Sequence, residues 1–169
     1  MRPNVRFFVA IFLAVFAGQS VSASPKQVAL APIQHQDAQL VVESPDGVTV
    51  TYTPEMLEAL PTYEITTTTP WRDTPATFSG VLLSDLLANH GMSDVSAIVV
   101  AAENEFQVVF ERSALEAAPV LIATRVDGRP HSRRQRGPIQ FIIADEDMRA
   151  NGALEESHLV WMAASIKAQ

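Results

Sequence analysis

Cysteine is absent from all 169 residues. Its absence excludes disulfides, a thiol nucleophile, an iron–sulfur site, an acylated lipoprotein anchor and any metal held by a protein thiolate. Glycine is scarce, with seven residues, and the chain has neither a glycine-rich phosphate loop nor a Gly-x-Ser-x-Gly elbow. The sequence therefore gives no support to a hydrolase or a nucleotidase, and the domain must be stable through packing alone.

Patterns typical of metal sites are also missing. The histidines are His35, His90, His131 and His158. No two of them are spaced to share one helical turn, as a zinc-protease helix requires. Asp145-Glu146-Asp147 is similar to the start of a calcium loop, but Arg149 stands at the next ligand position and the required glycine is displaced to Gly152. A solvated loop is the better interpretation.

Long apolar runs are limited to one, from Phe7 to Ala17, which follows Arg2 and Arg6 and precedes Val21-Ser22-Ala23. Eleven apolar residues rise only about 16 Å as a helix, about half of a bilayer core. The pattern predicts a secretory signal over residues 1–23, cleaved after Ala23, and a periplasmic protein without direct membrane insertion. The two arginines are not adjacent, so a twin-arginine signal is not indicated, and we expect export in the unfolded, empty state.

Cationic residues are in the minority. Removal of Arg2 and Arg6 leaves 10 Lys and Arg against 19 Asp and Glu, a net charge of −9. Such a surface repels polyanions, so we expect no nucleic-acid partner. The mature length of 146 residues suits one domain. Residues 24–37 mix prolines and glutamines without a period, which predicts a flexible leader before a domain over residues 38–169.

Strand patterns dominate the remaining chain. We expect strands over residues 39–43, 48–52, 63–69, 95–101, 106–110, 120–126, 139–144 and 159–166. Thr53 and Pro54 predict the start of one short helix, and residues 113–117 predict a single helical turn. Ser79 is expected to cap a further helix with an apolar face from Val81 to Leu87 that ends at Gly91. The class is α+β, a mixed β-sheet with short helices.

Two features suggest a binding site. Five of the ten mature cations fall within twelve residues: Arg125, Arg129, Arg133, Arg134 and Arg136. They form either a solvated loop paired to nearby acids or a site for an anionic or carbonyl-rich ligand or a protein partner. Trp71, beyond a strand end, is favoured as a stacking surface for a flat ligand, whereas core packing is slightly favoured for Trp161.

Several short motifs together resemble the sulfite-oxidase-type molybdopterin-binding domain. They are Thr66-Thr67-Thr68-Thr69-Pro70-Trp71, Phe78-Ser79-Gly80-Val81-Leu82-Leu83-Ser84-Asp85-Leu86-Leu87, Asp127-Gly128-Arg129-Pro130, Gly137-Pro138-Ile139 and Val160-Trp161. Their order and spacing match over about residues 38 to 166, which implies a sulfite-oxidase-like fold. In the enzymes of this family a cysteine binds molybdenum. Because this chain has none, and a threonine hydroxyl does not replace a thiolate, we expect neither molybdenum, nor a redox cofactor, nor catalysis.

An exported branch without that cysteine fits better: the chain resembles the periplasmic pterin receptors of the PruR type. This resemblance implies a free reduced pterin as ligand. It also implies docking on the periplasmic domain of an inner-membrane cyclase or phosphodiesterase of cyclic di-GMP, with signalling as the output. Two alternatives remain open: a molybdopterin oxidoreductase with an atypical metal site, and a ligand-free protein-interaction module.

The resemblance also implies a set of pterin-binding residues: Thr69, Trp71, Asn104, Glu105, Arg134, Arg136, Asp145 and Trp161. Trp71 is the stacking candidate. Glu105 or Asp145 would accept from the amino and ring N–H edge of the pterin, and Arg134 and Arg136 would donate to its carbonyl. Asn104 and Glu105 correspond to a polar pair at the family's cofactor cleft, although Phe106 replaces a common tyrosine there.

Overall fold

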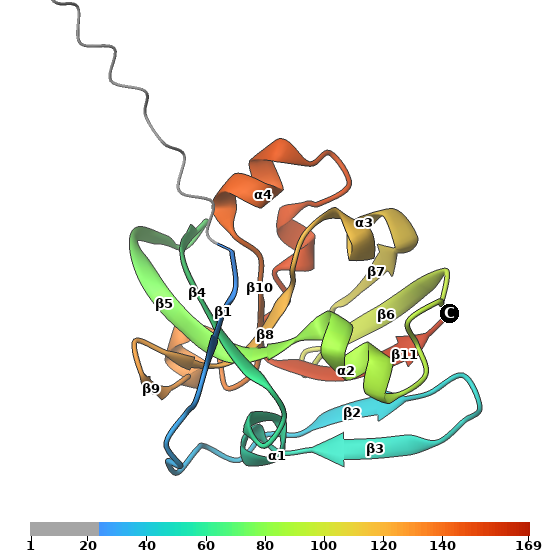
Figure 1. Cartoon of the computed structure of the whole chain (residues 1–169), viewed down its shortest axis with the longest axis horizontal. Coiled ribbons are helices and arrows are strands. Elements are labelled where there is room, and N and C mark those ends of the chain that lie inside the picture. Colours follow the sequence, from blue (N-terminus) through green and yellow to red (C-terminus); the bar gives the residue numbers. More distant parts are fainter. Residues whose placement is uncertain (1–23) are drawn as a thin grey trace, which may run out of the picture.

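The computed structural model describes residues 24–169, and the signal sequence inferred over residues 1–23 lies outside them. Two β-sheets form the body of the molecule (Figure 1). The six-stranded sheet is antiparallel throughout, in the order β1-β4-β5-β8-β10 with β9 paired to β8. Its strands are β1 Lys26–Val28, β4 Thr62–Thr69, β5 Arg72–Leu82, β8 Leu121–Val126, β9 Arg129–Pro130 and β10 Gln140–Ile142.

The five-stranded sheet has the order β3-β2-β11-β6-β7. Its strands are β2 Leu40–Glu43, β3 Thr49–Tyr52, β6 Ala97–Ala102, β7 Gln107–Glu111 and β11 Ala163–Ala168. Only β11 and β2 run parallel, so this sheet is mixed. The helices are all short: α1 Pro54–Glu58, α2 Leu83–Asn89, α3 Arg112–Ala117 and α4 Asp145–Ala150, with 3₁₀ turns η1 Arg133–Gln135 and η2 Glu156–His158. The expected α+β class is confirmed.

The main core lies between the two sheets. Val42 of β2, Ile98 of β6 and Ile122 of β8 are fully buried in one apolar cluster. Successive strand residues point to opposite faces. Leu121 and Ala123, which flank Ile122, therefore belong to a second cluster on the other face of the six-stranded sheet. Strand β8 is thus buried on both faces, including its polar residues Thr124 and Arg125.

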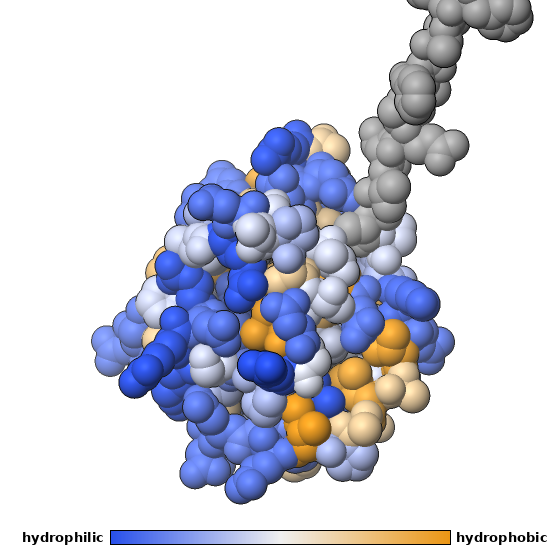
Figure 2. Space-filling view, turned by 90° about the vertical axis from the view of Figure 1, so that its left-hand side faces the viewer, coloured by the Kyte–Doolittle hydropathy of each residue, from blue (hydrophilic) through white to orange (hydrophobic). Residues whose placement is uncertain are grey.

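The surface is more polar than this interior. Figure 2 shows the face that lies on the left of Figure 1, where β5 and β9 are found, and most of it is hydrophilic, with apolar side chains confined to limited regions. Within residues 24–169, no helix is long and apolar enough to span a membrane.

Helix α1 follows the sequence prediction. The Thr53 hydroxyl accepts a hydrogen bond from the Met56 N–H at 3.3 Å, and Pro54 occupies the first turn. A proline there costs no helical hydrogen bond, because the first N–H groups have no intrahelical partner.

The prediction for helix α2 was wrong at its start. Ser79, Gly80 and Val81 continue strand β5 and pair with β8, and the helix begins only at Leu83, without a side-chain cap. A continuous apolar run does not distinguish a strand buried on both faces from a helix. Gly80 is required in the strand, because an added Cβ would lie 2.0 Å from the Ile122 carbonyl oxygen.

The predicted flexible leader over residues 24–37 is also corrected. Residues 26–28 form β1, which pairs with β4 in the register Gln27 to Tyr63. The Thr62 hydroxyl donates to the Val28 carbonyl at 2.6 Å. Strand β1 satisfies backbone groups along the edge of β4, so the folded unit begins before Ala38.

The acidic stretch at Asp145 is not a loop. Asp145, Glu146 and Asp147 form the first turn of α4, and Asp145 pairs with Arg149 one turn later at 2.8 Å. Carboxylates at a helix N-terminus interact favourably with the helix dipole, which explains why an acidic run begins a helix here.

Candidate functional site

Trp71 lies at the turn between β4 and β5. Pro70 and Trp71 separate Thr69 from Arg72, which pair across the hairpin. A proline suits such a turn because it supplies no N–H to a strand. The Trp71 side chain remains partly exposed, at 38%. The sequence prediction placed Trp71 just beyond a strand end, and the structure confirms that position.

Trp161 precedes the last strand rather than lying on it. It forms an isolated bridge with Gln140, and β11 begins two residues later at Ala163. Met162 between them adopts a positive φ of 51°, which interrupts the extended backbone. The predicted strand over residues 159–166 is therefore shortened, and the half-buried Trp161 side chain faces the site described next.

Arg136 joins the two tryptophans. Its guanidinium carbon lies 4.1 Å from the Trp71 ring centroid and 5.3 Å from that of Trp161, within cation–π distance of both. The backbone of Arg136 is left-handed, with φ 79°. Its N–H donates to the Arg133 carbonyl and its carbonyl accepts from the Met162 N–H, each at 3.2 Å. Turn hydrogen bonds on both sides thus hold an uncommon conformation that places the side chain between the rings.

Two hollows border this Trp71–Arg136–Trp161 cluster. The arginine hollow encloses about 370 Å³ and is lined by Thr69, Trp71, Arg72, Phe78, His131, Arg133, Arg134, Gln135, Arg136, Gln140 and Trp161. The aromatic hollow encloses about 300 Å³ and is lined by Trp71, Ala102, Asn104, Phe106, Glu156, Ser157, Leu159, Val160 and Trp161. Both volumes lie at the lower end of the range of small-molecule sites.

Positive charge is concentrated in the arginine hollow. Its lining includes no carboxylate among the residues that the structure describes. Arg133 pairs with Glu103 outside the lining, and this hydrogen bond raises the pKa of Arg133. Arg72 lies 3.6 Å from Asp127. Within residues 24–169, Arg134 and Arg136 have no ion-pair partner, so their donors are available to a ligand.

Arg125 belongs to the same arginine-rich segment but has a structural role. Its guanidinium donates to both carboxylate oxygens of Glu58, at 2.9 and 2.5 Å, and to the Ala31 carbonyl at 2.7 Å. His35 lies 3.0 Å from the same carboxylate. Burial acts to raise the pKa of Glu58, but the hydrogen bonds from Arg125 and Thr124 outweigh it, and the pKa lies below its ordinary value. Pairing with an acid, which one of the two interpretations of the segment predicts, therefore holds for Arg125, although this residue lies on a buried strand and not in a solvated loop.

The eight predicted site residues divide into three groups. Thr69, Trp71, Arg134, Arg136 and Trp161 line the arginine hollow. Asn104 lines the aromatic hollow, and its side-chain oxygen accepts from the Phe106 N–H at 3.2 Å. Neither predicted carboxylate lines a hollow of this cluster. Glu105 occupies a left-handed turn position with φ 67°, and Asp145 is paired with Arg149 on α4.

Sequence reasoning missed His131. This histidine is 2% exposed, and its Nε2 lies 2.7 Å from the Gln140 side-chain oxygen on the wall of the arginine hollow. Burial lowers the pKa of His131, as does the positive charge of Arg72, although the Gln140 hydrogen bond acts in the opposite direction. The spacing of the histidines bears only on metal binding, and a lone histidine in a loop carries no further signal.

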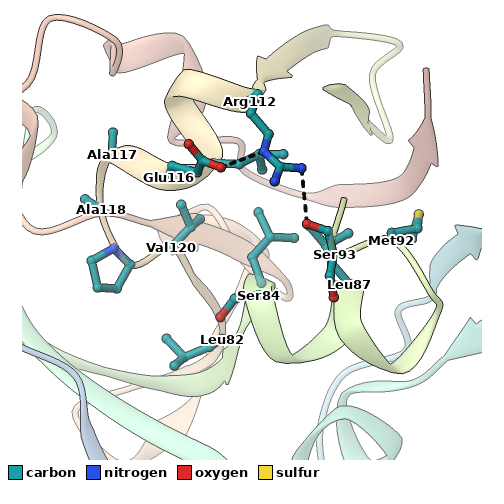
Figure 3. A pocket seen from close by; sticks show the side chains of 13 residues that line it. Leu82, Ser84, Leu87, Met92, Ser93, Arg112, Glu116, Ala117, Ala118 and Val120 are labelled. Carbon is teal, nitrogen blue, oxygen red and sulfur yellow. Dashed lines mark hydrogen bonds and ion pairs between the residues drawn. The ribbon is translucent and has the colours of Figure 1, made fainter. Parts of the chain in front are cut away.

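A third cavity lies apart from the predicted residues. It encloses about 520 Å³ between α2, α3 and the start of β8, and most of its lining is apolar (Figure 3). At its rim, Arg112 donates to Glu116 at 2.6 Å and to the Ser93 carbonyl at 3.3 Å. The guanidinium is engaged with the protein itself, so the cavity offers a ligand mainly apolar contact.

The donor set does not fit a molybdenum centre. The chain has no cysteine to supply a thiolate, and the hydroxyls near Trp71 are neutral ligands. Thr67 is moreover engaged, since its hydroxyl oxygen accepts from the Asp145 N–H at 2.9 Å. Within residues 24–169, no group of three or more histidines or acidic residues is placed to hold a metal ion.

Comparison with known proteins supports the fold. No protein-family model and no curated protein matches the sequence. The structure, however, is sulfite-oxidase-like. It resembles the sulfane dehydrogenase SoxCD from Paracoccus pantotrophus with a TM-score of 0.60 at 15% sequence identity. The match covers 82% of this chain but only 39% of the SoxCD chain, so this chain spans about two-fifths of that protein's length.

Proposed function

We propose that this protein is a non-catalytic receptor for a free reduced pterin. The observation that carries the proposal is the guanidinium of Arg136, which lies against both tryptophan rings. It borders a hollow in which Arg134 and Arg136 have no ion-pair partner among residues 24–169. A pterin is flat and has a carbonyl beside an amino and ring N–H edge. Stacking on an aromatic ring matches its flat face, and donation from an arginine matches its carbonyl. Its N–H edge requires an acceptor in addition.

The sulfite-oxidase-like fold supports the same proposal. The chain combines this fold with a complete lack of cysteine, which removes the thiolate that the family's enzymes use to bind molybdenum. A hollow lined by aromatic and arginine side chains but without that thiolate is suited to binding rather than to redox catalysis. We therefore propose no redox cofactor and no molybdenum.

The proposal includes location and output. The apolar run from Phe7 to Ala17 and the small residues before Ser24 support export to the periplasm. There the protein would capture its pterin and dock on the periplasmic domain of an inner-membrane cyclase or phosphodiesterase of cyclic di-GMP. Resemblance to the PruR-type receptors supports this partner class.

Calorimetric titration of the purified mature protein with reduced pterins tests the ligand. We expect binding accompanied by quenching of tryptophan fluorescence, because two tryptophans border the hollows. Absence of heat with every pterin tried would refute the proposal. Co-purification of the candidate partner domain with and without pterin tests the output, and equal capture in both conditions would favour a ligand-free interaction module instead.

A further inference from the structure

His131 presents a hydrogen-bonding atom that no group in the protein satisfies. Its Nδ1 is buried and has no partner among the described residues, whereas its Nε2 is bound to Gln140. A buried polar atom left unpaired costs about 1–3 kcal/mol. His131 is also one of the residues that line the arginine hollow. A ligand that supplied a donor here would recover this cost.

The Gln140 contact determines which kind of partner Nδ1 needs. The glutamine oxygen only accepts, so the hydrogen on the imidazole resides on Nε2 and Nδ1 carries a lone pair. Burial and the nearby positive charge of Arg72 lower the pKa of His131, which keeps the ring neutral. Nδ1 is therefore an acceptor at neutral pH.

This acceptor lies among donors. The charged residues that line the hollow are arginines, which only donate. A flat ligand with a carbonyl alone would satisfy the arginines but not Nδ1. A ligand with an N–H next to a carbonyl would satisfy both, and the predicted carboxylates Glu105 and Asp145 lie outside this lining.

We propose that His131 Nδ1 accepts a hydrogen bond from an N–H group of the bound heterocycle, while Arg134 or Arg136 donates to the adjacent carbonyl. The site thereby selects ligands with an amide-like or aminopyrimidinone edge. This inference rests on the proposed pterin-binding function. Nδ1 has no exposed surface of its own, so the ligand reaches it after side chains of the hollow rearrange. Arg134 is exposed and has no ion-pair partner in the described part of the chain.

A double variant, His131→Phe with Gln140→Leu, tests the inference. Removal of both partners leaves no orphaned polar atom, so the fold is retained, and phenylalanine keeps the edge contact with Phe78. The probes are pterin, its 3-methyl analogue and its 2-dimethylamino analogue, which lack the ring N–H and the amino N–H respectively. In the wild type we expect at least one analogue to bind about tenfold or more weakly than pterin. In the double variant we expect pterin to bind more weakly than to the wild type. The ratio between the affinities for pterin and for that analogue should fall to about twofold or less.

His158→Asn is the matched control. His158 is also buried, but its Nδ1 already accepts from the Glu155 N–H at 2.9 Å, and it lines neither hollow. We expect this variant to discriminate between the probes as the wild type does. Unchanged discrimination in the double variant would overturn the role of His131 while leaving pterin binding intact. No binding of pterin to the wild type would instead refute the proposed function.

Nitrogen NMR of the imidazole supplies a readout besides affinity. In the free protein, we expect His131 Nε2 to be protonated and Nδ1 to be unprotonated. Addition of pterin should shift the Nδ1 resonance, because that atom gains a hydrogen bond. A protonated Nδ1 in the free protein, or an Nδ1 resonance unchanged in a saturated complex, would contradict the proposal.

Discussion

Arg125 and Arg136 lie eleven positions apart in one arginine-rich segment, yet the fold gives them opposite surroundings. Arg125 projects from a buried strand, its side chain is 5% exposed, and Glu58 accepts two of its hydrogen bonds. Arg136 sits in a turn, half-buried against two rings, with no ion-pair partner among residues 24–169. A buried charge requires a partner, whereas a charge at a hollow is available to a ligand. Arg125 is thus neutralised by a buried partner, whereas the guanidinium of Arg136 keeps donors that a ligand could use.

The largest expected effect comes from breaking the buried pair. Glu58→Gln leaves the Arg125 guanidinium buried without its counter-charge, and we expect the free energy of unfolding to fall by about 3–5 kcal/mol. Urea denaturation measures the change. Glu103→Gln, which removes the partner of the exposed Arg133, is the control and should cost about 1 kcal/mol or less. Equal losses in both variants would contradict the distinction.

Trp71→Ala tests the other region. A stacking ring contributes about 1–3 kcal/mol to the binding of a flat base, so pterin affinity should fall by about 5- to 150-fold. Because Trp71 is partly exposed, the unfolding free energy should change far less than in Glu58→Gln. Calorimetric titration and urea denaturation of the same samples provide both values. A stability loss comparable to that of Glu58→Gln would assign Trp71 to the core instead.

Arg136→Met removes the cation between the rings while keeping an unbranched side chain. We expect the stability to fall by about 0.5–1 kcal/mol, the usual contribution of a cation–π contact at a partly exposed site. The tryptophan fluorescence of the ligand-free protein should also change, since the guanidinium lies near both rings. Arg129→Met, at an exposed residue outside both hollows, is the control and should leave the fluorescence unchanged.

The smallest expected effect is a difference in pH dependence between the two regions. The lowered pKa of Glu58 means that its contribution to stability is present above about pH 4.3 and is lost as the pH falls below that value. The lowered pKa of His131 means that its neutral form is favoured in the fold, so stability is lost as the pH falls from about 6.5. Unfolding midpoints measured from about pH 7.5 down to about pH 2.5 should show both steps.

His90 contributes to the same pH range as His131, because burial also lowers the pKa of His90. A control variant is therefore needed to separate the two histidines. The double variant His131→Phe with Gln140→Leu should lose the His131 part of the upper step, which begins at about pH 6.5. It should keep the lower step, which comes from Glu58. Superimposable pH profiles for wild type and double variant would show that His131 does not contribute to the upper step.

Much of the fold was predictable from local patterns. Thr53 and Pro54 specified the start of α1, and the alternating β-branched residues from Tyr63 to Thr69 specified β4. The start of α2 was not predictable, because the apolar residues Val81 and Leu82 fit a buried strand as well as a buried helix. Strand β1 was also missed, since residues 26–28 have no strong strand pattern and gain their structure from pairing with β4.

The candidate site was predictable only in part. Aromatic and arginine residues were identified by type, and five of the eight candidates line one hollow. Glu105 and Asp145 were chosen because a pterin needs an acceptor, but sequence position does not show which way a carboxylate faces. His131, which also lines that hollow, was missed because its burial and its contact with Gln140 arise only in the fold.

Composition and local pattern were sufficient to establish the lack of thiolate chemistry, the acidic surface, the α+β class and the concentration of arginine near the C-terminal third. Those properties depend on which residues are present and on short-range backbone preferences. The roles of individual arginines and histidines were decided by tertiary structure alone. Burial and partners determine whether a charge is neutralised or available. Those partners lie far away in the sequence, as Glu58 does from Arg125, and as Trp71 does from Arg136.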